Sequence, residues 1–221
     1  MTHSPDPSLE ALLLAGATEL GVELTAEQAS QLFTLSAELA DRNDRFNLTA
    51  IRDPREVVVK HLLDSLSVLP HLHGKAIADA GTGAGFPGLP LAIVDASRRY
   101  TLIEATTKKA KFVQHVVDRL GLSHATVVNA RSEAFKPPRR FDTVVARALG
   151  SLAEFIRVAG HLCAPGGRLL AMKGRLPEAE IAAIPAAWRV RESPRLRVPG
   201  LDAERHLVVL QRAADVKSGS R

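Results

Sequence analysis

Glycines and acids at defined intervals are the residues of this chain best suited to holding a nucleotide. From Ala76 to Val94 a short apolar run ends in the acid Asp79, a glycine-dense turn follows, and a second apolar run closes the stretch. In a strand–turn–helix unit, glycines let the backbone pass close to a ligand and the helix N-terminus faces it. The stretch therefore predicts a nucleotide-binding turn, and its glycines are Gly81, Gly83, Gly85 and Gly88.

Two kinds of cofactor fit this turn. The run from Gly83 to Gly88 matches G-x-G-x-x-G, and Glu104 lies 21 residues after Gly83, as in dinucleotide-binding units. The same arrangement also serves S-adenosylmethionine, where the acid after the second strand binds the ribose hydroxyls. A carboxylate accepts hydrogen bonds from a vicinal diol in either case, so Glu104 does not distinguish the two cofactors.

The elements that position these residues alternate from residue 76 onward. Apolar runs predict strands at 76–80, 99–104, 125–129, 141–146 and 168–172. Helices are expected at 88–95, 108–120, 149–162 and 178–184, which makes each connection long enough for a crossover. This alternation predicts an α/β fold with a doubly wound, mostly parallel sheet. Two closing β-like runs, 188–191 with 196–198 and 206–211, predict an antiparallel C-terminal strand at its edge.

The N-terminal third reads as helical. Thr25 and Gln28 form a capping-box pattern before one amphipathic helix, residues 42–51 are expected to be a loop, and Asp53-Pro54 starts another helix. No flexible linker follows it. We therefore expect residues 1–75 to pack on a domain of residues 76–213, with a disordered tail at 214–221.

Composition bounds the class of protein. The 221 residues are 46% hydrophobic and include one cysteine, Cys163, which cannot form an internal disulfide, so a cytoplasmic setting is expected. No signal peptide, membrane span or zinc-ligand spacing is visible, so neither a membrane nor a metal is expected. Nothing suggests an obligate dimer, and we expect a monomer.

Charge is unevenly distributed along the chain. Residues 1–75 carry 6 Lys and Arg against 11 Asp and Glu, whereas residues 76–221 carry 23 against 13. A basic C-terminal part suits a polyanion such as RNA, although a solvated basic surface explains it equally well. Candidate contacts to an RNA backbone are Lys108, Lys109, Lys111, Arg139 and Arg140, and four arginines surround a Phe46-Asn47 loop expected to border the active-site cleft: Arg42, Arg45, Arg52 and Arg55.

Longer motifs narrow the choice of cofactor. An acid followed by Gly-Thr-Gly-Ala-Gly, a Pro-Gly-Gly turn before the fifth strand and the closing strands together look like a class I S-adenosylmethionine-dependent methyltransferase. The chain resembles, more closely, the RsmG (GidB) family of bacterial methyltransferases, which act on a guanine N7 of 16S ribosomal RNA. The resemblance covers about residues 10 to 210. It rests on Arg45–Ile51, His61–Ser65, Gly81–Leu91 and Ala146–Ala148.

The resemblance implies a set of cofactor contacts. Gly81 and Phe86 would flank the methionine part of S-adenosylmethionine, beside Gly83 and Gly85 of the same turn. The other implied residues line the ribose and adenine side (Glu104, Ala105 and Thr106), bracket the adenine (Ser132 and Glu133), or reach toward the cofactor or the incoming base (Arg147). Arg147 is the residue expected to act in catalysis, and the implied partner is ribosomal RNA in the small subunit or its precursor.

Methylation at guanine N7 requires no dedicated general base, because the nucleophile is an existing lone pair. The chain fits that requirement, since the fourth strand ends in Val-Ala-Arg147 and not in the Asn/Asp-Pro-Pro-aromatic motif of exocyclic-amine methyltransferases. We expect His61 to be structural, Cys163 to be buried away from the site, and Lys173 to be either a phosphate contact or a surface cation. Two alternatives stay open, a methyltransferase of a small molecule or protein and a non-catalytic RNA-binding protein on the same scaffold.

Overall fold

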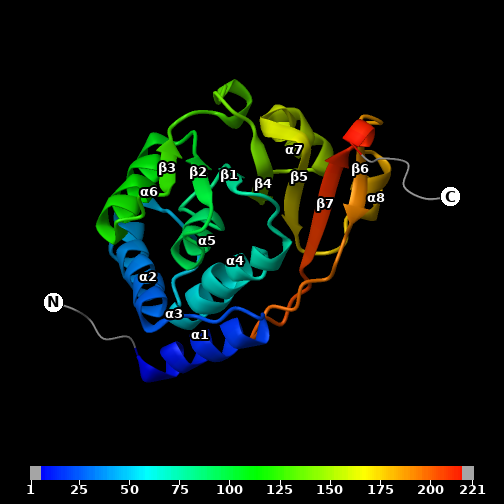
Figure 1. Cartoon of the computed structure of the whole chain (residues 1–221). Coiled ribbons are helices and arrows are strands. Elements are labelled where there is room, and N and C mark those ends of the chain that lie inside the picture. Colours follow the sequence, from blue (N-terminus) through cyan, green and yellow to red (C-terminus); the bar gives the residue numbers. More distant parts are fainter. Residues whose placement is uncertain (1–5, 216–221) are drawn as a thin grey trace.

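One seven-stranded sheet organises the protein in the computed structural model, which describes residues 6–215. Its order is β3-β2-β1-β4-β5-β7-β6, visible from left to right in Figure 1. The strands are β1 (Ala76–Ala80), β2 (Arg99–Ile103), β3 (Ala125–Val128), β4 (Phe141–Arg147), β5 (Cys163–Lys173), β6 (Trp188–Glu192) and β7 (His206–Arg212). β1 to β5 pair in parallel, and β7 pairs antiparallel with both β5 and β6. The predicted fold class is confirmed.

The chain order reverses at the centre of this sheet. β1 lies between β2 and β4, with Asp79 aligned to Leu102 on one side and Val145 on the other. Successive strands therefore lead away from β1 in both directions. In open α/β sheets a ligand binds outside the carboxyl ends of the strands at such a point. The topology accordingly places the site above Ala80, where the glycine-rich turn begins.

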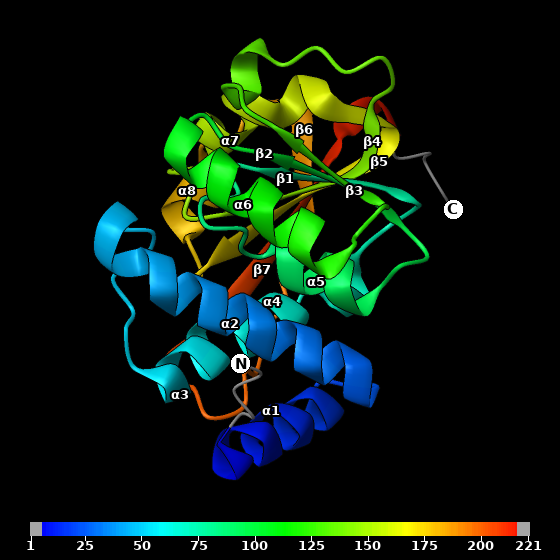
Figure 2. The same ribbon diagram turned by 90° about the vertical axis from the view of Figure 1, so that its left-hand side faces the viewer.

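Helices cover both faces of the sheet. They are α1 (Pro7–Glu19), α2 (Ala26–Phe46), α3 (Pro54–Val57), the π-helix η1 (Val58–Leu63), α4 (Asp64–Leu66), η2 (Leu69–His71), α5 (Gly88–Val94), α6 (Thr107–Leu120), η3 (Ser132–Ala134), α7 (Leu152–Ala159), η4 (Gly160–Leu162), α8 (Glu178–Ala182) and η5 (Ala213–Asp215). Figure 2 shows α6, α2 and α1 following one another outward from one face. No helix within residues 6–215 has the length and apolar character needed to cross a membrane.

The N-terminal helices share a hydrophobic core with one face of the sheet. Leu32 of α2, Leu62 of η1 and Ile77 of β1 belong to one buried cluster, whereas Ala78 and Ala80 of the same strand belong to the cluster beneath α7. Alternate residues of β1 thus face opposite layers, as the period of a strand requires. Apolar packing holds the helical layer to the sheet. It therefore also fixes the side chains of this layer relative to the ends of the strands.

The end of α2 differs from the sequence-based expectation. The capping box is present, since Thr25 Oγ1 accepts from the Gln28 amide at 3.2 Å and Gln28 Oε1 accepts from the Thr25 amide at 2.9 Å. However, the helix continues to Phe46, although residues 42–51 were predicted to be a loop. The reason is Asn43, a polar residue on the buried face that interrupts the apolar pattern. Its amide group bonds both the N–H and the carbonyl of Thr49 and so fixes the chain after the helix.

The C-terminal elements also differ in detail. β5 begins at Cys163, and the Pro-Gly-Gly turn interrupts its ladder with β4 in place of preceding the strand. Residues 196–198 form no strand, and beside them only Arg195 makes an isolated bridge, to His206. The helix expected at 149–162 starts at Leu152, where Ser151 caps it. Of the tail expected to be disordered, residues 214–215 belong to η5, and residues 216–221 lie outside the described part of the chain.

Candidate active site

Asp79 holds the two ends of the glycine-rich turn together. Its Oδ2 accepts hydrogen bonds from Thr82 Oγ1 at 2.6 Å and from the Gly88 amide at 2.7 Å. Glycine is needed at position 88, because a Cβ there would lie 2.3 Å from Leu102 Cδ2 and 2.7 Å from Asp79 Oδ2. Burial raises the pKa of Asp79 to about 6, although these hydrogen bonds and the charge of Arg147 act in the opposite direction. Asp79 is therefore a buried structural acid that shapes the turn.

Glu104 supports the same turn from the end of β2. Its Oε2 accepts from the Gly83 amide at 2.9 Å, and its Oε1 accepts from the Thr106 amide at 2.7 Å. The residue is 7% exposed. A carboxylate offers about four lone-pair positions, so two backbone donors leave room for further hydrogen bonds. Glu104 can thus hold the glycine loop and still accept from a diol.

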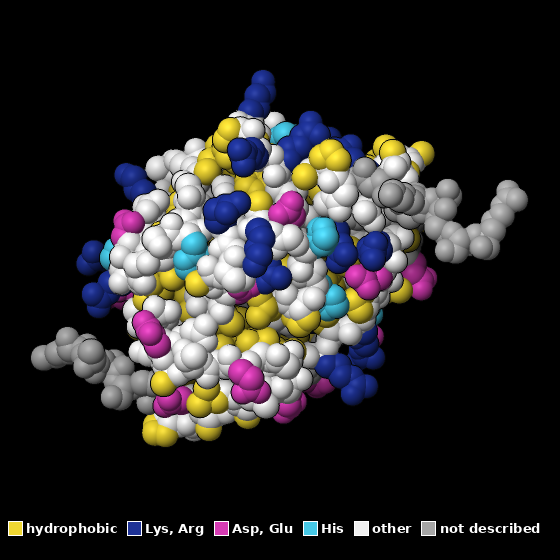
Figure 3. All heavy atoms as spheres, in the orientation of Figure 1, with side chains coloured by type: hydrophobic (Ala, Val, Ile, Leu, Met, Phe, Trp, Pro, Cys, Tyr) yellow, Lys and Arg dark blue, Asp and Glu magenta, His cyan; other side chains and the backbone are white. Residues whose placement is uncertain are grey.

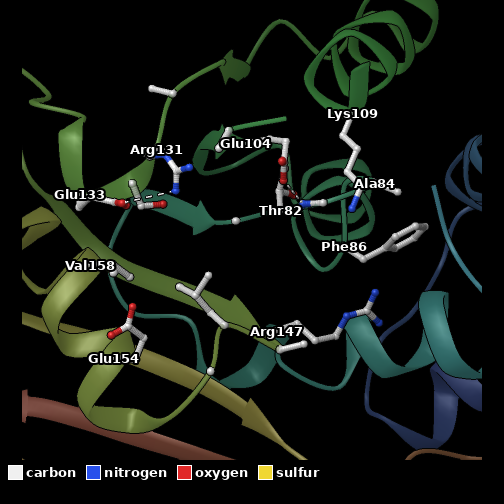
Figure 4. A pocket seen from close by; sticks show the side chains of 18 of the residues that line it. Thr82, Ala84, Phe86, Glu104, Lys109, Arg131, Glu133, Arg147, Glu154 and Val158 are labelled. Carbon is white, nitrogen blue, oxygen red and sulfur yellow. Dashed lines mark hydrogen bonds and ion pairs between the residues drawn. The ribbon is translucent and has the colours of Figure 1, made fainter. Parts of the chain in front are cut away.

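A cleft of about 710 Å³ opens at this edge of the sheet. Figure 4 shows Glu104 and Thr82 in the middle of its wall, Arg131 and Glu133 at one end, and Phe86 with Arg147 at the other. Its size is within the range of small-molecule sites. Among its lining residues are most of those predicted from the sequence: Gly81, Gly83, Phe86, Glu104, Ala105, Ser132, Glu133 and Arg147.

The two remaining predicted residues, Gly85 and Thr106, do not line the cleft. Gly85 faces the following helix, where an added Cβ would lie 2.2 Å from Leu89 Cδ1. Thr106 precedes α6, and its amide is taken by Glu104. Both residues shape the walls of the cleft but present no side chain to it. A motif match alone could not reveal this.

Arg147 is fixed by three partners at the end of β4. Its Nη1 donates to the Lys60 carbonyl at 2.9 Å and to Asp64 Oδ2 at 3.2 Å, and its Nη2 donates to His61 Nδ1 at 3.1 Å. The guanidinium carbon also lies 5.4 Å from the centre of the Phe86 ring. Arg147 therefore joins the sheet to the N-terminal helices at one end of the cleft.

His61 is a neutral positioning residue. Arginine can only donate, so Nδ1 of His61 accepts, and the proton on Nε2 points to Thr49 Oγ1 at 2.9 Å. Burial, reinforced by the charge of Arg147, lowers the pKa of His61 to about 3. Both ring nitrogens are thus engaged and the ring is uncharged at neutral pH.

Known proteins resemble both the sequence and the fold. The model of the GidB family, described as rRNA small subunit methyltransferase G, matches residues 28–208. The chain belongs to this family. It is 50% identical to ribosomal RNA small subunit methyltransferase G of Xanthomonas campestris pv. campestris strain 8004 over 86% of this chain and 89% of that one. With the protein of that name from Stenotrophomonas maltophilia strain K279a it shares 47% identity over 95% of this chain and 99% of that one.

Two solved structures have the same fold class as this GidB-family chain. A predicted O-methyltransferase from Agrobacterium tumefaciens has a TM-score of 0.55 at 26% identity, covering 69% of this chain and 79% of that one. TrmN from Thermus thermophilus has a TM-score of 0.54 at 18% identity, covering 70% and 53%. The family and this fold together confirm that the protein is a methyltransferase that uses S-adenosylmethionine. The alternative cofactor, a dinucleotide, is therefore excluded.

The cleft of this family member suits that cofactor. The backbone of Gly81 and Gly83 has positive φ of 71° and 61°, a conformation that L side chains adopt only with strain. No side chain therefore stands between this backbone and a ligand. Glu104 keeps unused acceptor positions that fit a ribose diol, and Ser132 also lines the cleft. These residues are therefore compatible with the diol of the methyl donor.

Sequence reasoning missed two residues next to Arg147. Asp64, 2% exposed, accepts from Arg147 through Oδ2 and from Arg205 Nε through Oδ1 at 2.9 Å. Asp64 lies three residues after His61 within one helical run, so this spacing could have indicated that the two side chains share a face. Arg205 precedes β7, and no sequence pattern indicated its role. Together with Arg147 they form a partly buried ionic cluster next to the cleft, in which only Asp64 is fully buried.

Lys173 does not line the main cleft; its Nζ donates to the Gly150 carbonyl at 2.6 Å and to Glu180 Oε2 at 2.8 Å. Cys163 is buried at the start of β5. Within the described residues, no three His, Cys, Asp or Glu side chains are grouped as metal ligands.

Proposed function

We propose that this protein transfers the methyl group of S-adenosylmethionine to N7 of a guanine in 16S ribosomal RNA. The names of its relatives support a small-subunit ribosomal RNA as the substrate. Surface charge agrees with a polyanionic partner, because on the face shown in Figure 3 the Lys and Arg side chains gather over the upper part and the Asp and Glu side chains over the lower part.

The chemistry places few demands on proton transfer. The methyl donor supplies an electrophilic sulfonium methyl group. The lone pair of guanine N7 forms the new N–C bond as the S–C bond breaks, and its electron pair goes to sulfur, so no proton leaves the base. The task of the protein is to hold the two reactants in line. A site for this step needs hydrogen-bond donors and surfaces that position the reactants, and it needs no general base.

The observation that carries the proposal is the engagement of His61 on both ring nitrogens. It cannot accept a further proton without losing its bond from Arg147. Arg147 has five N–H donors, of which three serve Lys60, Asp64 and His61. The remaining two are available to the O6 of an incoming guanine, which would leave N7 free to react.

The test is methyl transfer from labelled S-adenosylmethionine to small subunits purified from cells that lack the protein. N7-methylguanosine is then mapped by borohydride reduction and aniline cleavage. We expect one strong cleavage site, which weakens with Glu104→Gln when the cofactor is limiting. Label in protein or at another base position would support a different substrate class. RNA binding without any cofactor binding would support the non-catalytic alternative.

A cytoplasmic monomer is part of the proposal. Sedimentation at micromolar concentration should give a mass near 23.7 kDa. A stable dimer, or a fraction of the protein bound to membranes in lysates, would contradict this part.

A further inference from the structure

A second cavity lies beside the cleft, between the C-terminal end of α2 and the start of α6. Its volume is about 540 Å³, and its lining residues are Arg42, Phe46, Thr107, Lys108, Lys111 and Phe112. Figure 2 shows the two helices side by side on the same face of the sheet. The cavity is referred to below as the α2–α6 groove.

Cations without partners mark this groove. Lys108 and Lys111 are exposed, and within residues 6–215 neither has an ion pair or side-chain hydrogen bond. The described residues that line the groove include no carboxylate. Glu38 of α2 is already engaged by Arg42 at 3.4 Å, by His115 at 2.8 Å and by Arg119 at 3.5 Å. The positive charge of the two lysines is therefore available to an external anion.

Residues adjacent in sequence line the groove and the active-site cleft. Phe46 lines the groove, and Leu48 and Thr49, two and three residues later, line the cleft. On the opposite side Lys108 lines the groove and Lys109 the cleft. The same two segments thus border both spaces. A polymer whose reacting unit occupies the cleft would have its neighbouring unit at the groove.

We propose that the α2–α6 groove binds the single-stranded RNA backbone next to the target guanine. Lys108 and Lys111 neutralise phosphates, and the half-buried ring of Phe46 contacts a neighbouring base or sugar. The proposal rests on the proposed function, because it takes the polymer to be the RNA that is methylated. Lysines beside an aromatic ring, without carboxylates, are the combination that single-stranded nucleic acids prefer.

The decisive variant is Lys108→Ala/Lys111→Ala. Its matched control is Lys75→Ala/Arg99→Ala, which removes the same charge from exposed residues at the opposite, amino-terminal ends of β1 and β2. Affinity for deproteinised small-subunit ribosomal RNA is measured against salt concentration. For the groove variant we expect the slope of log K against log salt to fall by about 1.4, and the affinity at 0.1 M salt to fall roughly 10- to 30-fold. The control should match the wild type more closely on both counts.

A second variant tests the aromatic ring of Phe46 independently of the charges of Lys108 and Lys111. Phe46→Leu keeps an apolar side chain at the base of the groove but removes the aromatic face. We expect roughly tenfold weaker RNA binding with an unchanged salt slope. Cofactor affinity, measured by calorimetry, should stay at the wild-type value for all these variants and so report correct folding.

Two results would overturn the proposal. One is equal RNA affinity and salt slope for the groove variant and its control. The other is weakened binding to assembled subunits with unchanged binding to naked RNA, which would make the groove a protein contact. If the wild type binds RNA but transfers no methyl group to guanine N7, the proposed function fails, whereas the groove is still judged by the variants.

Discussion

The imidazole of His61 stacks on the phenyl ring of Phe86, with ring centroids 4.4 Å apart and planes inclined by 12°. Phe86 belongs to the loop after β1, and His61 belongs to the π-helix η1 of the N-terminal layer. The stack therefore ties the glycine-rich turn directly to the helical layer. π-helical turns occur often at functional sites, and here the turn presents both His61 and the Lys60 carbonyl to Arg147.

Acidification should destabilise the protein through His61. Between its folded pKa of about 3 and its ordinary 6.5, the unfolded chain binds a proton that the folded chain does not. The free energy of unfolding attributable to His61 therefore falls as the pH falls, by about 1.4 kcal/mol per unit. Urea unfolding should show that the stability of the wild type relative to His61→Gln falls by about 1.6 kcal/mol from pH 6.5 to pH 5. A constant difference would contradict the neutral, buried imidazole.

Asp79 provides the internal control, because its effect has the opposite sign. Burial raises its pKa from 3.8 to about 6, so in this range the folded chain holds a proton that the unfolded chain lacks. Its contribution to stability is present below pH 3.8 and is lost as the pH rises through about 6. The two slopes oppose each other in the wild type. Asp79→Asn should steepen the rise of stability with pH, and His61→Gln should reverse it.

Much of the site could be predicted because each strand end carries a local signal. An apolar run followed by glycine, acid or arginine located the turn, Glu104 and Arg147, and parallel pairing brought these ends to one edge. The bond between Asp64 and Arg205 joins residues 141 positions apart, so no local pattern could reveal it. The extension of α2 was missed because buried Asn43 reads as a polar loop residue, although its side chain is satisfied by Thr49.

Glu104→Gln should weaken cofactor binding. Glutamine has one side-chain oxygen, so its amide nitrogen would face the N–H of either Gly83 or Thr106, and the acceptor for the ribose would be lost. We expect the dissociation constant for S-adenosylmethionine to rise roughly 10- to 100-fold in calorimetry. Glu180→Gln is the matched control, since Glu180 also accepts from a backbone amide, that of Leu152, but does not line the cleft. Equal affinities for the two variants would remove Glu104 from the cofactor site.

Asp64→Asn should destabilise the fold by about 3 kcal/mol, because it leaves the guanidinium groups of Arg147 and Arg205 together without a countercharge. Removing one cation at the same time should recover part of the loss. We therefore expect Asp64→Asn/Arg205→Gln to be more stable than the sum of the two single variants predicts, by about 1 kcal/mol or more in denaturant unfolding. Strict additivity would show that the three charges do not act as a cluster.

Arg147→Lys tests whether this residue serves the reaction or only the fold. Lysine keeps the charge, but its three donors lie on one nitrogen and not in a planar fork, so bonds to Lys60, Asp64 and His61 would leave no donor for the base. We expect single-turnover methylation at saturating RNA to fall about 100-fold, with cofactor affinity within about twofold of wild type. Arg212→Lys is the matched control: Arg212 lies 4.8 Å from the centre of the Trp188 ring and donates to the Gly160 carbonyl at 2.9 Å, away from the cleft. Both variants should lose similar stability. A methylation rate for Arg147→Lys equal to that of the control would make Arg147 a structural residue.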